Sequence, residues 1–274
     1  MKITGLIIAV LTGALLIYAT ADFPAWGDPH SPASLHVSPR YIEKTIEETA
    51  VPNAVTSVLA DYRGYDTMYE TTVIFSAGVA CFLLLRIFRR REPEERLYRH
   101  VLTGVTIHVK EGKLPPSDDF ERIDSAWTPP DLIIKTMCRL LIPFIQLFAL
   151  YVIAHGHHSP GGGFQGGVML GASVILLAIS QDLRTTVRRL REKVDALLCA
   201  AGVFIYAGTG ALCMLLGANF LDYSDLDRIL RCGPIMARSH GIFIVEIGVG
   251  IAVMATMIWI YCNVSSSGEY DEGL

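Results

Sequence analysis

The chain has 274 residues, of which 51% are hydrophobic and 18% are charged, and its mean hydropathy is +0.41. Soluble domains usually carry about 25% charged residues, so this composition excludes an ordinary soluble globular protein. The net charge of -4 gives no basis for nucleic-acid binding, and the 6 cysteines form no CxxC pair of the kind that holds iron–sulfur clusters or zinc.

Six apolar runs each approach the ~20 residues that a helix needs to cross the hydrocarbon core of a bilayer. The sequence therefore predicts an all-α integral membrane protein with six transmembrane helices. The first run could also be a secretory signal, since residues 19–21 resemble a cleavage site. We favour a retained helix, because the run is long and only Lys2 precedes it. The predicted spans cover residues 3–20, 67–88, 132–155, 162–181, 194–218 and 239–262.

Basic residues are distributed unevenly between the connections. Residues 86–131 hold nine Lys or Arg and residues 182–193 hold five, whereas the three alternate loops together hold six. Basic segments stay on the cytoplasmic side of a membrane. This bias predicts a multi-pass protein of the cell (inner) membrane with both termini in the cytoplasm and an acidic extracytoplasmic loop at 21–66.

The chain is predicted to have four parts. These are a two-helix segment at 1–88, a basic cytoplasmic linker at 89–131, a four-helix domain at 132–262 and an acidic cytoplasmic tail at 263–274. The linker is either the seam of two once-separate proteins or a large cytoplasmic loop. Alternation at 105–109 predicts a short strand in it. Near-helical spacing at 41–49 predicts a short amphipathic helix that lies on the outer surface or against a partner.

Charged side chains inside spans usually face a bundle interior, a cavity or a partner. Glu246 lies about two turns inside the sixth span among apolar neighbours. Asp66 and Glu70 are four residues apart near the outer end of the second span, where they could equally make interfacial contacts or ion pairs. Lys135, near the inner end of the third span, faces the interior or snorkels to the cytoplasmic surface.

A glycine-rich block joins the third and fourth spans. Residues 155–167 read HGHHSPGGGFQGG, and irregular backbone at membrane depth must be covered by protein or by a water-filled cavity. The block therefore predicts a tightly packed or wet place. Gly163, Gly167 and Gly171, four residues apart, predict a face for close helix packing. The histidines of this block have no carboxylate or cysteine partner nearby, so we expect no metal site.

Residues 132–262 resemble the MnhB family, whose members belong to Mrp-type cation/proton antiporter complexes. Residues 156–167 match the family's GHxxPGGGFxGG signature, and residues 220–223 and 240–250 resemble its last loop and span. The signature positions are Pro143, Pro160, Gly161, Gly162, Gly163, Phe164, Gly166 and Gly167.

The first half has a resemblance of its own. Residues 61–71 are similar to a DxRGxDTxxE segment found at the C-terminal end of the MrpA protein and in the small MbhE-type proteins of Mrp-related membrane-bound hydrogenases. The family has a glycine before the matching glutamate, where this chain has Tyr69.

Together the two resemblances imply a fused, non-catalytic membrane subunit of an Mrp-type Na⁺/proton antiporter module without a cofactor. Its partners would be the large A/D-like subunits, the small C-, F- and G-like subunits and membrane lipid. The alternative is a structural anchoring or assembly subunit of an Mrp-related membrane-bound hydrogenase or other oxidoreductase complex. By analogy, the candidates for an ion or proton path are Glu70, Glu246, Asp66, His157, His240 and Lys135.

Overall fold

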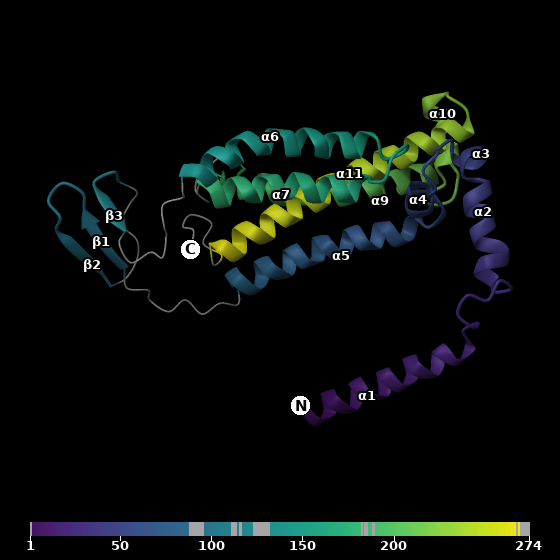
Figure 1. Cartoon of the computed structure of the whole chain (residues 1–274), viewed down its shortest axis with the longest axis horizontal. Coiled ribbons are helices and arrows are strands. Elements are labelled where there is room, and N and C mark those ends of the chain that lie inside the picture. The colour runs from purple at the N-terminus through teal and green to yellow at the C-terminus, as the bar shows by residue number, and fades with distance from the viewer. Residues whose placement is uncertain are drawn as a thin grey trace.

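A computed structural model describes residues 2–87, 96–110, 114, 117–122, 132–181, 183, 186–187, 190–266 and 268. Within these residues, 6 helices are long and apolar enough to cross a membrane, which confirms the predicted number of spans. They are α1 (Lys2–Ala19), α5 (Gly64–Phe82), α6 (Leu132–Ala154), α7 (Gly163–Gln181), α9 (Glu192–Leu215) and α11 (Pro234–Ser265) (Figure 1).

Helix α11 is the centre of the bundle. Figure 1 shows α6 and α7 on one side of it and α5 on the other, and α9 also packs against it. In the most apolar window of α11, 61% of the residues are buried, compared with 11% in α5. Small side chains let neighbouring backbones approach such a helix closely. The small residues buried in α11 include Gly241, Gly248, Gly250, Ala252 and Ala255.

Helices α9 and α11 are antiparallel and meet at glycines. A Cβ atom on Gly202 would lie 2.5 Å from both the backbone nitrogen of Ala252 and the carbonyl oxygen of Gly248. One turn earlier in α9, the Sγ atom of Cys199 accepts a hydrogen bond from Oγ1 of Thr256, at 3.4 Å. These two contacts fix the register of the pair.

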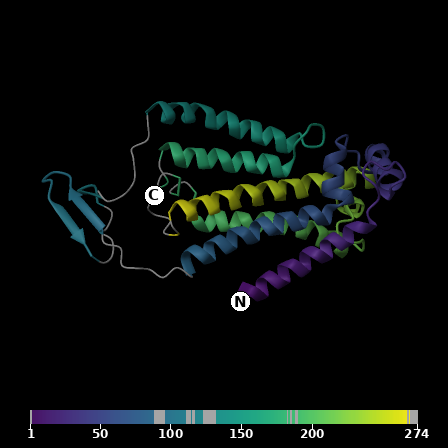
Figure 2. The ribbon, with the colours of Figure 1, turned by 60° about the horizontal axis from the view of Figure 1, so that its bottom comes forward.

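Helix α1 lies apart from the bundle in both views of the ribbon (Figures 1 and 2). None of the residues in its apolar window is buried. A short 3₁₀ turn, η1 (Thr20–Asp22), follows it. A large apolar helix of this kind needs lipid or another protein chain around it.

Short helices cover one end of the bundle. The helix predicted near residues 41–49 is present as two pieces, α2 and α3, divided at Lys44. Two further pieces, η5 and α10, join α9 to α11 at the same end (Figure 1). The pieces are the π-helical turns η2 (Ala33–Val37) and η3 (Val58–Tyr62), the α-helices α2 (Ser38–Glu43), α3 (Thr45–Thr49), α4 (Ala54–Ser57) and α10 (Asp227–Leu230), and the 3₁₀ helix η5 (Tyr223–Leu226).

The opposite end carries a small antiparallel sheet, so the chain is not wholly helical. It consists of β1 (Arg96–His100), β2 (Thr106–Val109) and β3 (Phe120–Arg122) in the order β2-β1-β3. The alternating segment predicted the position of β2, and the other two strands had no such pattern. A π-helical turn, η4 (Leu83–Ile87), ends α5 before this linker. The basic cluster at 89–91 lies outside the described residues, as does most of the acidic tail.

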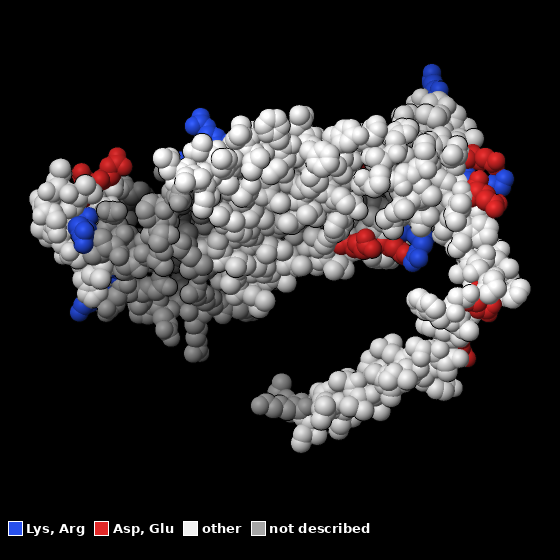
Figure 3. Space-filling view, in the orientation of Figure 1, with Lys and Arg blue, Asp and Glu red and all other residues white. Residues whose placement is uncertain are grey.

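The distribution of charge along the bundle is that of a membrane-spanning protein. On the face shown in Figure 3, Lys, Arg, Asp and Glu gather towards the two ends and leave a largely uncharged middle. Helix α11 begins at Pro234, five residues before the predicted start at 239. Proline is well suited to the first turn of a helix, because its fixed φ angle matches and its missing N–H is not needed there.

Candidate functional site

The loop between α6 and α7 depends on glycine. Gly161 and Gly162 have φ angles of +134° and +149°, a conformation that residues with a side chain rarely adopt. A Cβ atom on Gly161 would also lie 2.6 Å from Cγ1 of Val152. The backbone can therefore turn tightly from one span into the next at this point.

The carboxylate of Glu246 lies inside this turn. The backbone N–H of Gly163, at the start of α7, donates a hydrogen bond to Oε2 of Glu246 at 2.8 Å. A Cβ atom on Gly162 would lie 2.6 Å from Oε2 and 2.8 Å from Oε1, and one on Gly156 would lie 3.1 Å from Oε2. Helix N-termini favour negative charge. Glycine residues thus form the space that this carboxylate fills.

The small-residue face of α7 continues the contact along α11. A Cβ atom on Gly163 would lie 1.9 Å from the carbonyl oxygen of Glu246, and one on Gly167 would lie 2.6 Å from the carbonyl oxygen of Gly250. One turn beyond Gly167, Gly171 faces Met257. This close approach is what brings the glycine loop onto the Glu246 side chain.

Asn53, to which the sequence assigned no functional role, ties the first half of the chain to this loop. Its Nδ2 group donates to the carbonyl oxygens of Gly156 and Ser159, both at 2.9 Å. Its backbone N–H donates to the carbonyl oxygen of His157 at 2.9 Å. Thr56 adds a hydroxyl hydrogen bond to Gly156, also at 2.9 Å.

Replacing Asn53 with alanine is expected to lower the thermal stability of the purified protein in detergent. The two side-chain hydrogen bonds to the loop contribute roughly 1–3 kcal/mol together, at about 0.5–1.5 kcal/mol each. Asn53 also caps α4 through its Oδ1 atom, which accepts from the N–H of Val55 at 3.1 Å. Asn53→Asp keeps an acceptor for this cap and loses the donor to the loop. An Asp variant as stable as the original would show that only the cap matters.

His157 is the other predicted site residue that the structure places at this loop. Its Nε2 atom lies 3.2 Å from the carbonyl oxygen of Ser239, so Nε2 carries a proton in this contact. Burial lowers the pKa of His157, and the hydrogen bond to Ser239 acts in the opposite direction. Its ring packs at 5.7 Å from that of Phe243, while the rings of His155 and His158 pack on each other at 5.4 Å. His157 thus contacts α11, whereas His155 and His158 contact each other.

The remaining predicted residues lie away from the Glu246 carboxylate. Asp66, in the first turn of α5, forms an ion pair with Arg63, the residue just before this helix. Glu70 has an exposed side chain on the same helix, and His240 and Lys135 are also exposed. The structure therefore groups Glu246 and His157 at the loop and leaves Glu70, His240 and Lys135 on the surface of this chain.

A buried ion pair holds the same end of the bundle together. Nη2 of Arg238, in the first turns of α11, lies 2.6 Å from Oδ2 of Asp61, whose side chain is only 3% exposed. Burial raises the pKa of Asp61, and the guanidinium of Arg238 acts against this. Tyr206 and Tyr223, both fully buried, donate to the carbonyl oxygens of Gly64 and Ala60 at 2.9 and 3.1 Å. Sequence reasoning assigned no role to Asp61 or Arg238.

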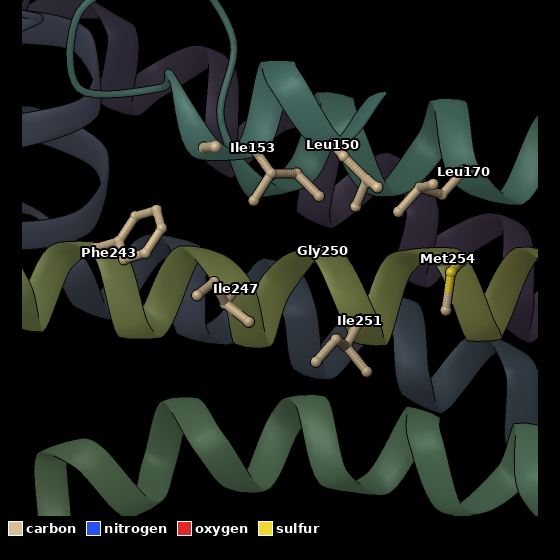
Figure 4. Close-up of a pocket in the computed structure, with 9 residues that line it drawn as sticks. Leu150, Ile153, Leu170, Phe243, Ile247, Gly250, Ile251 and Met254 are labelled. Carbon is tan, nitrogen blue, oxygen red and sulfur yellow. The ribbon is translucent and has the colours of Figure 1, made fainter. Parts of the chain in front are cut away.

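An apolar pocket of about 370 Å³ opens beside the loop between α6, α7 and α11. Figure 4 shows Phe243 and Ile247 of α11 facing Ile153 and Leu150 of α6 across it. All its lining side chains are apolar, so this pocket suits hydrocarbon rather than an ion. Its lining residues are Leu150, Ile153, Ala154, Leu170, Phe243, Ile247, Gly250, Ile251 and Met254.

Comparison with protein families gives two matches. Residues 133–259 match the family described as "Domain related to MnhB subunit of Na+/H+ antiporter". Residues 2–98 match the MbhE family, which represents the E-type subunit of MBH.

Individual proteins extend these matches. The B-type subunit of the Na(+)/H(+) antiporter of Bacillus subtilis strain 168 is 31% identical over 136 residues, which are 46% of this chain and 92% of that protein. An uncharacterized protein of Methanocaldococcus jannaschii is 27% identical over 232 residues, 82% of each chain. A chain of the membrane-bound sulfane sulfur reductase, an archaeal respiratory membrane complex, shares the fold with a TM-score of 0.51 and 24% identity, covering 92% of this chain and 97% of that one.

Proposed function

Because the chain belongs to the family of MnhB-related subunits of Na⁺/H⁺ antiporters, we propose that it is a non-catalytic membrane subunit of a cation/proton antiporter module. In this role it lies in the cell (inner) membrane with both termini in the cytoplasm, and it helps to form the path along which sodium ions and protons move. The observation that carries the proposal is the carboxylate of Glu246, held by one backbone N–H among glycines in the central helix.

Glu246 has the chemistry for this role. Carboxylates in membrane-spanning segments are costly and mark ion paths and proton relays. Among the described residues, Gly163 donates to Oε2 of Glu246, and the second oxygen, Oε1, is available there to a proton or a sodium ion. Oxygen ligands are those that hard cations prefer. A carboxylate held in this way can therefore take up and release a proton, or bind sodium, as its surroundings change.

The glycine loop closes the outer end of this site. Its backbone lies against Glu246, and Asn53 and His157 fix it to α4 and α11 through hydrogen bonds. Movement of the loop would open the carboxylate to the outer solution. Glu70, which is exposed on α5, would face a neighbouring subunit and continue the path there. The partners in this proposal are the large A/D-like and small C-, F- and G-like subunits of an Mrp-type assembly.

Glu246→Gln in the assembled complex is the direct test. Glutamine keeps the size of the side chain and cannot exchange a proton, so we expect sodium/proton exchange in membrane vesicles to fall at least about tenfold, since positioned acid–base groups usually contribute more than this. The amount of complex recovered with a tagged chain should not change.

The matched control is Glu47→Gln, which removes an exposed carboxylate on α3 and should leave exchange as it was. Unchanged exchange in a normally assembled Glu246→Gln complex would rule out the ion-path role of Glu246.

The match of residues 2–98 to the MbhE family favours a second candidate function. In that case the chain anchors a membrane-bound hydrogenase or another oxidoreductase complex, and its carboxylates make fixed contacts. Purification of the tagged chain in mild detergent separates the two candidates. Antiporter-type membrane subunits alone support the first, and additional iron–sulfur or nickel subunits support the second.

A further inference from the structure

Asp195 is a buried carboxylate for which the proposed path has no role. Asp195 lies in the first turn of α9 and is fully buried, with 0% of its surface exposed. Neither of its side-chain oxygens has a hydrogen-bond partner in the described part of the chain. An ionised carboxylate in such a place loses the hydration that stabilises its charge and gains nothing in exchange. Asp195 therefore needs a proton or a bound cation.

The register of α9 and α11 shows what lies opposite Asp195. Cys199, one turn further along α9, contacts Thr256 of α11. Because the helices are antiparallel, Asp195 lies at the level of Trp259 and Asn263, one to two turns beyond Thr256. This layer is at the end of the bundle opposite the glycine loop, and the proposed topology makes it the cytoplasmic end.

The polar groups of this layer are incompletely paired as well. Nε1 of Trp259 and Oδ1 of Asn263 are buried and lack hydrogen-bond partners among the described residues. Nδ2 of Asn263 is already used, since it donates to the carbonyl oxygen of Trp259 at 2.8 Å. In the connection before α9, Oγ1 of Thr186 is also buried without a partner in the described ranges. Buried polar groups are normally paired, so an unpaired group in a native structure calls for an explanation.

A protonated Asp195 balances this set of donors and acceptors. Protonation would bring an O–H donor to a layer in which Oδ1 of Asn263 lacks one, and it would leave an acceptor oxygen on Asp195. No hydrogen bond joins Asp195 to Asn263 or Trp259 in the described structure, so such pairing requires a small side-chain adjustment. Ionised, Asp195 would add two charged acceptors and leave Asn263 unpaired. No group of three or more His, Cys, Asp or Glu side chains is placed to hold a metal ion among the described residues. A proton is therefore the occupant that this layer favours.

Among the residues that the structure describes, charged and titratable groups near Asp195 lie on α9, η4 and α11. Glu192, one turn nearer the surface on α9, is held by Arg86 of η4 at 2.6 Å. Cys199 follows on α9, and Cys262 of α11 lies in the same apolar cluster. The Glu192 side chain is 26% exposed, so solvent reaches to within one helical turn of Asp195.

We propose that Asp195 is a proton-exchanging carboxylate at the inner end of the α9–α11 interface, which takes a proton from the cytoplasmic water and returns it during transport. The proposal rests on the proposed antiporter function and adds a site at the opposite end of α11 from Glu246. The proton moves between a water molecule and the carboxylate, so no other reactant is needed.

The test compares Asp195→Asn with Asp195→Glu in the complete complex. Asparagine imitates the protonated acid, so assembly should be normal while sodium/proton exchange falls at least about tenfold at every pH, in line with the usual contribution of an acid–base group. Glutamate should restore exchange with an altered pH profile. Glu192→Gln, which removes the neighbouring carboxylate, should change exchange by less than about twofold, as expected of a partly exposed ion pair.

Two results would overturn the proposal. One is an Asp195→Asn complex with normal exchange, and the other is a loss of exchange that merely follows a loss of assembly. If deletion of the whole chain left exchange intact, the proposed antiporter function itself would fail. If Glu246→Gln abolished exchange and Asp195→Asn did not, only the role of Asp195 would fail.

Discussion

Gly163→Ala is expected to prevent the chain from folding and assembling stably. The added methyl group would lie 1.9 Å from the carbonyl oxygen of Glu246, and a backbone atom cannot move aside as a flexible side chain can. Extra atoms in a packed core usually cost about 1–3 kcal/mol. We expect the cost of this contact to reach or exceed the upper end of that range, because α7 must separate from α11 along the whole glycine face. The amount of tagged chain in the membrane and its thermal midpoint in detergent measure the effect.

Gly208→Ala is the matched control, because it makes the same change within α9. A Cβ atom there would lie 3.7 Å from the ring of Phe204, an ordinary contact. Alanine also favours helix over glycine by roughly 1 kcal/mol, so this variant should be at least as stable as the original chain. If Gly163→Ala behaved in the same way, α7 and α11 could not be as close as the structure has them.

Hydropathy was sufficient to predict the six spans, because each is a continuous apolar run of membrane length. Glu246 was also identifiable, since it is an isolated charge in such a run. That its carboxylate meets the N–H of Gly163 could not be predicted, because the two residues are 83 positions apart. Their contact depends on how α7 and α11 pack, and apolar periodicity does not specify which faces meet.

Asn53 and Asp195 show why the rest of the site was missed. Asn53 lies in the short connection between α3 and α4, where most asparagines make local turns or caps. Its hydrogen bonds to the glycine-rich loop become visible only in three dimensions. Asp195 lies in the first turn of a predicted span, where a carboxylate is ordinarily interfacial and favoured by the helix dipole. Only the burial of both its oxygens distinguishes it from such a residue.

Strands β1 and β3 of the linker sheet were missed for a different reason. β1 contains Arg96, Tyr98 and Arg99, and its pairing with β3 involves strands separated by about twenty residues of chain. Short polar strands of this kind gain their stability from cross-strand pairs rather than from their own propensities. The alternation of apolar and polar residues at 105–109 was therefore the only local pattern that predicted a strand in the linker.

The ion pair between Asp61 and Arg238 should have the second large effect. Arg238→Met leaves a carboxylate that is 3% exposed without its partner, where it is held at present by a contact of 2.6 Å. Removing one member of a buried pair typically costs about 3–5 kcal/mol. The thermal midpoint of the purified chain should fall accordingly, and α11 should separate from the outer helices, which Arg238 joins through Asp61.

The size of this loss should depend on pH. Burial already raises the pKa of Asp61, and Arg238 opposes the rise, so the pKa increases further when Arg238 is removed. The folded variant then keeps a proton that the unfolded chain releases. Its stability therefore falls as the pH rises from the unfolded value of about 3.9 through the raised pKa of Asp61 in the folded variant, and the loss is complete above that pKa. The double variant Asp61→Asn with Arg238→Met, which leaves no buried charge, should recover most of the stability and lose this pH dependence. If the double variant were as unstable as Arg238→Met alone, packing rather than charge would explain the effect.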